Sequence, residues 1–131
     1  MSKEPNIDDL KSKIGFGIKI WLEFGSIDKK KNILGSGWAK LLENLDKNMS
    51  GSLTQAAEEC GYSYKYAWNI LKRIEKRTGM SVVNTGKGGR GGGGYVELNE
   101  WGKYLLKTYN NLLFELEIIE KRLGETFKIN E

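Results

Sequence analysis

The sequence contains no histidine and a single cysteine, Cys60. Without these residues there is no cysteine/histidine zinc site and no histidine general base. One cysteine also excludes an intramolecular disulfide framework, and a cytoplasmic location is the default for such a chain. The carboxylates and lysines form no constellation typical of a catalytic site. We therefore expect no cofactor, no metal and no enzymatic activity.

Long apolar runs are absent as well. No stretch reaches the roughly 18 apolar residues of a membrane-spanning helix, so no membrane partner is expected. The first nine residues hold acids and a proline before any apolar run, unlike a secretory signal. The 131 residues, 39% of them hydrophobic, suffice for one domain with a single core.

Charge is unevenly placed along the chain, although its net value is only +4. Residues 51–94 carry seven Lys or Arg against three Asp or Glu, whereas residues 95–131 carry five against seven. A localised basic segment is typical of nucleic-acid binders. A solvated lysine-rich surface would show the same pattern, so charge alone does not decide.

The apolar pattern predicts a mainly α fold with a small β component. Residues 16–24 alternate in polarity, which predicts a half-buried strand, and residues 32–34 are expected to pair back on it. Helical spacing predicts a first core helix from about Ser36 to Asn48. The expected organisation is a flexible arm (1–14), a winged helix-turn-helix (15–98), and a dimerisation helix with its tail (99–131).

The central signal is a helix-turn-helix: helix 53–60, turn 61–63 and helix 64–78. Ser52 and Gln55 fit a capping box at its start, and Gly61 is placed as a left-handed stop. Ser63 is the predicted N-cap of the second helix, whose inward face carries Ala67, Leu71, Ile74 and Ile70.

The opposite face of that helix mixes aromatic, lysine and asparagine side chains, whereas a solvated face would be Lys, Glu and Gln. An α-helix fits the major groove of B-DNA. There Asn69 could bind adenine bidentately, and Lys65 could donate a hydrogen bond to guanine or to phosphate. The candidate DNA-binding residues here are Ser63, Tyr64, Lys65, Trp68, Asn69 and Lys72, with Lys76 on the same face. The alternative is that Trp68 is partly buried and Tyr66 completes the core.

Two predicted strands, 82–85 and 95–98, flank a loop in which every residue from 86 to 94 is glycine except Lys87 and Arg90. With no acid nearby, Lys87 and Arg90 are candidate contacts to phosphate or a minor groove. A disordered connector with incidental charge is the alternative. The loop matches GxGxxG formally, but a strand follows it rather than a helix, and Gly88 after Lys87 excludes a P-loop.

The last predicted helix, capped by Asn99 and running to about Leu123, carries a heptad-type seam. The seam predicts a homodimer. Its candidate dimerisation residues are Leu105, Tyr109, Leu112, Leu116 and Ile119.

With these elements in order, the chain resembles the DNA-binding domain of the ModE-type molybdate-responsive regulators, kin of the LysR-type helix-turn-helix. The resemblance lies in residues 34–37, 51–57 and 61–68, in the glycine-rich wing 85–94 and in residues 98–102. It implies a dimer that places two recognition helices in successive major grooves, joined largely by the helix after the wing. The domain is expected to stand alone, without the family's oxyanion-binding domains, so direct molybdate sensing is not expected. Either a partner delivers the signal, or the protein has no small-molecule ligand.

The expected function is that of a sequence-specific, double-stranded DNA-binding transcription regulator acting as a homodimer. Two alternatives stay open: a winged-helix module that binds proteins, and a non-specific chromatin or nucleic-acid-binding protein.

Overall fold

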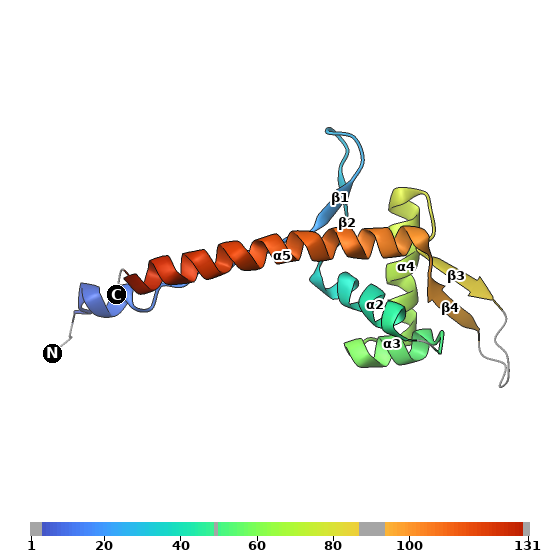
Figure 1. Cartoon of the computed structure of the whole chain (residues 1–131), viewed down its shortest axis with the longest axis horizontal. Coiled ribbons are helices and arrows are strands. Elements are labelled where there is room, and N and C mark those ends of the chain that lie inside the picture. The colour runs from blue at the N-terminus through green and yellow to red at the C-terminus, as the bar shows by residue number, and fades with distance from the viewer. Residues whose placement is uncertain (1–3, 49, 87–93, 130–131) are drawn as a thin grey trace.

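The computed structural model describes residues 4–48, 50–86 and 94–129. Figure 1 shows a helical body with two small hairpins and one long C-terminal helix that extends away from it. The elements are α1 (Ile7–Lys11), β1 (Leu22–Phe24), β2 (Lys31–Leu34), α2 (Ser36–Lys47), α3 (Leu53–Cys60), α4 (Tyr64–Thr78), β3 (Val83–Gly86), β4 (Tyr95–Leu98) and α5 (Glu100–Ile129). This architecture confirms the predicted mainly α winged-helix fold with a small β component.

The core lies where α2, α3 and α4 meet, against β4 and the start of α5. Leu41, Leu42, Ala56, Ala67 and Ile74 have no exposed surface. Each helix contributes its apolar face, as its spacing predicts. Burial of these faces fixes the angle between α3 and α4, on which any helix-turn-helix function depends.

Local signals set the helix ends as predicted. The Ser52 hydroxyl accepts a hydrogen bond from the Gln55 backbone N–H at 3.1 Å, and Ser63 does the same for Tyr66 at 3.1 Å. Gly61 ends α3 in the left-handed region, at φ 76°. The reciprocal half of the capping box is wrong, because the Gln55 side-chain oxygen accepts a hydrogen bond from the Ser50 hydroxyl at 3.3 Å rather than from the Ser52 N–H.

The wing strands pair as an antiparallel hairpin, with Val83 opposite Leu98. β4 has its predicted bounds, and β3 lies one residue later than expected. The N–H of Val96 donates to the Gly51 carbonyl at 2.9 Å, which ties the base of the wing to the segment just before α3. The wing is thereby fixed relative to the helix-turn-helix.

The predicted half-buried strand over residues 16–24 is wrong. Only Leu22–Phe24 forms a strand, and the side chains of Phe16 and Ile18 remain 42% and 39% exposed. The described residues before β1 pair with no strand. They lie beside α5 instead (Figure 1). There the Phe16 ring stacks on that of Phe127, with ring centroids 5.5 Å apart. The short helix α1 was not predicted, and α5 extends beyond its predicted end near Leu123 to Ile129.

Candidate nucleic-acid interface

The turn between α3 and α4 is closed by backbone hydrogen bonds. The N–H of Tyr62 donates to the Ala57 carbonyl at 2.9 Å, and that of Gly61 donates to Glu58 at 3.0 Å. Ala57 is 1% exposed, so the small side chain lets the two helices cross closely. The turn is therefore a rigid corner that fixes the orientation of α4 relative to α3.

The outward face of α4 carries a narrow row of side chains, here called the contact stripe: Lys65, Asn69, Lys72 and Lys76. Their spacing of four, three and four residues puts them on one face of the helix. All four are exposed, on the side of α4 opposite its buried residues. The stripe thus presents three ammonium groups and one carboxamide, which suit phosphates and base edges.

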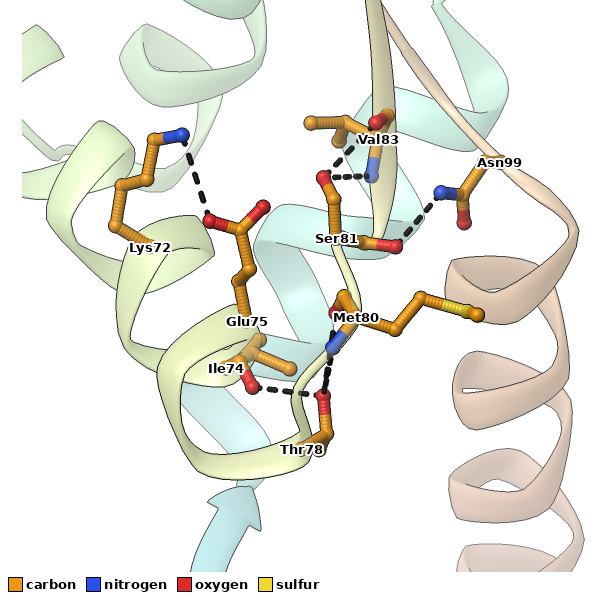
Figure 2. A network of polar contacts seen from close by, with 8 residues as sticks. All are labelled: Lys72, Ile74, Glu75, Thr78, Met80, Ser81, Val83 and Asn99. Carbon is orange, nitrogen blue, oxygen red and sulfur yellow. Dashed lines mark hydrogen bonds and ion pairs between the residues drawn. The ribbon is translucent and has the colours of Figure 1, made fainter.

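Trp68 and Glu75 lie on one flank of the stripe and position Lys72. The Lys72 Nζ atom is 5.1 Å from the centre of the Trp68 ring and 3.6 Å from a Glu75 carboxylate oxygen (Figure 2). An exposed ion pair of this kind contributes about 0–1 kcal/mol, so the Lys72 ammonium can exchange Glu75 for a phosphate. Trp68 is partly buried against the core, as one alternative held, whereas Tyr66 is 47% exposed and does not complete it.

A polar network fixes the end of α4 against the wing and α5 (Figure 2). The Thr78 hydroxyl donates to the Ile74 carbonyl at 2.9 Å. Asn99 donates to the Ser81 carbonyl at 2.7 Å, and its side-chain oxygen accepts from the Gly102 N–H at 2.8 Å, which caps α5 as predicted. Wing and contact stripe therefore keep one relative orientation.

The remaining predicted residues of this surface lie as follows. Ser63 is the N-cap of α4, and Tyr64 beside it is 54% exposed. Lys87 and Arg90 lie outside the described residues. Across the described part of the chain, no group of three or more His, Cys, Asp or Glu residues is placed to hold a metal ion, and no helix is long and apolar enough to span a bilayer.

No protein-family model matches the chain. The DNA-binding transcriptional dual regulator ModE of Escherichia coli K12 is 38% identical over 64 residues, which are 49% of this chain and 24% of ModE. The molybdenum transport protein ModE of Azotobacter vinelandii is 32% identical over 92 residues, 70% of this chain and 32% of that protein. The molybdenum-pterin-binding protein MopB of Rhodobacter capsulatus is 38% identical over 60 residues, 46% and 22% of the two chains.

The chain carries a ModE-type winged helix-turn-helix domain. It spans about a quarter to a third of the length of the relatives in Escherichia coli and Azotobacter vinelandii. The predicted resemblance to this type is thereby confirmed.

Sequence reasoning missed Arg73 and Arg77, which lie on the other flank of α4. Arg77 follows Arg73 by one helical turn, and Arg73 follows Asn69 of the contact stripe by the same spacing. Helical spacing alone predicts that the two arginines share one flank of α4. It does not predict that both guanidinium groups contact the ring of Trp38 in α2.

The predicted dimer seam of α5 divides into two groups. Leu105, Tyr109 and Leu116 are buried within the single chain, at 4%, 3% and 7% exposure. Leu112 and Ile119 are 40% and 47% exposed. Leu105 and Tyr109 belong to the hydrophobic core, and Leu116 is buried outside that core. Of the five seam side chains, Leu112 and Ile119 are the two exposed enough to contact a partner.

Proposed function

We propose that this chain is a sequence-specific, double-stranded DNA-binding transcription regulator that acts as a homodimer. The contact stripe is the observation that carries the proposal: three lysines and one asparagine in register along the second helix of a helix-turn-helix, opposite its buried face. The Escherichia coli relative, which is named a DNA-binding transcriptional dual regulator, supports it. The stripe carries three lysines and no apolar side chain, whereas the core of a protein-binding surface is apolar and depleted of lysine.

In this proposal α4 lies in the major groove with its N-terminal half toward the base edges. Asn69 pairs with an adenine through its amide, and Lys65 donates to a guanine or to phosphate. Lys72 and Lys76 meet backbone phosphates farther along the helix. Lys87 and Arg90 of the glycine-rich loop contact the backbone or an adjacent minor groove.

The homodimer forms through the exposed apolar side of α5. Leu112 and Ile119, seven residues apart, share one face of the helix, and Phe114 and Ile118, which are 62% and 42% exposed, lie on a different face. Four large apolar side chains along one projecting helix leave an unfavourable surface in water, and a second copy covers it. Two copies then present two α4 helices to successive major grooves.

The test begins with selection of bound duplexes from a random library, because the operator is not known. We expect one enriched motif and an affinity for it that falls steeply between two salt concentrations in fluorescence anisotropy. Asn69→Ala weakens binding by about 1–3 kcal/mol and relaxes the motif at one base pair. Lys121→Ala, on the projecting part of α5, is the matched surface control and leaves both unchanged. Equal affinity for single strands, or no enriched motif, contradicts the proposal.

A further inference from the structure

A groove of about 410 Å³ runs along the flank of α4 that faces away from the wing. Its walls include Trp38, Tyr62, Tyr66, Arg73 and Arg77, and we call it the arginine groove. Arg73 and Arg77 come from α4, Trp38 from the first turn of α2, and Tyr62 from the turn before α4. The groove thus lies at the corner of the helix-turn-helix, next to the contact stripe.

Two positive charges share one aromatic ring in this groove. The Cζ atoms of Arg73 and Arg77 lie 6.0 and 5.8 Å from the centre of the Trp38 ring. Arg77 donates one further hydrogen bond to the backbone carbonyl of Asn32, which holds its guanidinium in place. The ring and this carbonyl order the two groups before any ligand arrives.

The arginine groove has no negative charge to balance these cations. Its lining contains no Asp or Glu, and within the described residues neither arginine forms an ion pair. Each guanidinium has five N–H donors, of which Arg77 spends one on Asn32. The free donors and the mutual repulsion of the two charges favour a bidentate anion, and phosphate geometry matches the guanidinium fork.

Tyr62 and Tyr66, which also line the groove, carry hydroxyl groups that can act as neutral donors. Tyr62 and Tyr66 pack edge to face with ring centroids 4.9 Å apart. Burial raises the pKa of the Tyr62 phenol, so its hydroxyl stays protonated and able to donate. A Cβ atom at Gly37 would lie 2.8 Å from the Tyr62 hydroxyl oxygen, so the glycine leaves room for that hydroxyl beside the first turn of α2.

The dimensions of DNA indicate what the arginine groove would face when α4 lies in the major groove. An α-helix with side chains is about 10–12 Å across, and the major groove is about 12 Å wide. When the contact stripe faces the bases, the two flanks of α4 therefore face the two phosphate backbones. The Trp68 and Glu75 flank faces β3, with Val83 across a small pocket, so the arginine groove faces the other backbone.

We propose that the arginine groove seats a backbone phosphate of duplex DNA, on the strand that borders the major groove opposite the wing. This inference rests on the proposed function and adds a phosphate contact that reads no base. Arg73 provides the bidentate contact, and Arg77 and the tyrosine hydroxyls complete the seat.

Salt dependence and phosphate ethylation test the seat on the full chain with a selected duplex. Loss of one phosphate contact by Arg73→Gln makes the slope of log affinity against log salt shallower by about 0.9. At low salt, Arg73→Gln binds the duplex more weakly than the wild type does, and its preferred motif stays the same. Lys121→Gln removes the same charge from the projecting part of α5 and is expected to change neither the slope nor the affinity. Arg73→Lys keeps the positive charge but cannot form the bidentate guanidinium contact. It is therefore expected to restore the wild-type slope but only part of the wild-type affinity.

Ethylation interference identifies the phosphate itself. Ethylation of one phosphate at the edge of the site weakens wild-type binding but has no further effect on Arg73→Gln. If the wild type binds the motif while Arg73→Gln keeps its slope and its interference pattern, the seat is wrong and the proposed function stands. A changed motif in Arg73→Gln overturns the seat in favour of base reading. A wild type that does not bind duplex DNA overturns both proposals.

Discussion

The side-chain amide of Asn44 in α2 donates a hydrogen bond to the Sγ atom of Cys60, the last residue of α3, over 3.2 Å. The same amide lies 3.5 Å from the Ala56 carbonyl oxygen. At 8% exposure, Asn44 is the one polar residue buried in the described part of the chain. A buried donor that finds both its partners on one neighbouring helix fixes how α2 meets α3.

Removal of this amide is expected to loosen the helix-turn-helix. Asn44→Ala lowers the free energy of unfolding by about 1–3 kcal/mol, because it deletes the contact and leaves a gap between two packed helices. Urea denaturation followed by circular dichroism measures the change. Asp46→Ala, an exposed position on the same helix, is the control and shifts stability by no more than about 0.5 kcal/mol. An Asn44→Ala variant as stable as the wild type contradicts the assignment.

The Cys60 thiol gives the fold a pH dependence of known sign. Burial raises the pKa of this thiol above its ordinary value, although the Asn44 hydrogen bond opposes the rise. As the pH rises, the thiol therefore ionises in the unfolded chain first, above about pH 8.5. This ionisation stabilises the unfolded state relative to the folded state until the pH reaches the pKa of the folded thiol. Urea midpoints of the wild type and Cys60→Ala are expected to differ by a constant amount from about pH 6 to 8. By about pH 9.5 the wild type loses more stability than the variant, and parallel curves throughout would refute the shift.

The helix-turn-helix was predictable because its signals are local. Ser52, Gly61 and Ser63 act within one helical turn, and the apolar spacing of α4 places its contact stripe without knowledge of any other element. The strand predicted over residues 16–24 was wrong because alternating polarity indicates only that a segment has one apolar and one polar face. It does not indicate which element covers the apolar face. A sheet needs a partner strand, and here α5, at the far end of the sequence, takes that place for Phe16. The arginine groove was hidden for the same reason, since Trp38 lies on another helix.

Gly102, in the first turn of α5, is required by close packing against the wing. A Cβ atom there would lie 2.4 Å from the Val82 carbonyl oxygen and 2.6 Å from a Leu98 methyl carbon. Gly102→Ala is therefore expected to destabilise the chain by about 1–3 kcal/mol, despite the higher helix propensity of alanine. A Cβ atom added at Gly124, in the same helix, would meet nothing within 4 Å, so this second glycine serves as the control.

Gly124→Ala is expected to stabilise α5 by up to about 1 kcal/mol, because only the propensity gain remains. Thermal unfolding of the two variants thus moves in opposite directions. Equal shifts would mean that β3, β4 and α5 can separate at no cost.

The division of the α5 seam predicts two kinds of variant. Leu112→Asp with Ile119→Asp puts two carboxylates on the exposed side of the helix, so each chain keeps its core but the apolar surface needed for pairing is lost. Analytical ultracentrifugation is expected to show a folded monomer with unchanged helicity. Leu116→Asp buries a charge inside the single chain and is expected to lower the unfolding temperature instead.

Dimer loss also has a DNA-binding consequence. A monomer reaches one half-site only, so the double variant is expected to bind a selected palindromic duplex at least about tenfold more weakly, while its affinity for an isolated half-site stays that of the wild-type domain. Anisotropy with full-site and half-site duplexes separates these effects. An undisturbed dimer in the ultracentrifuge would place the interface on another surface and remove Leu112 and Ile119 from it. Normal full-site affinity from a proven monomer would mean that the two recognition helices act independently.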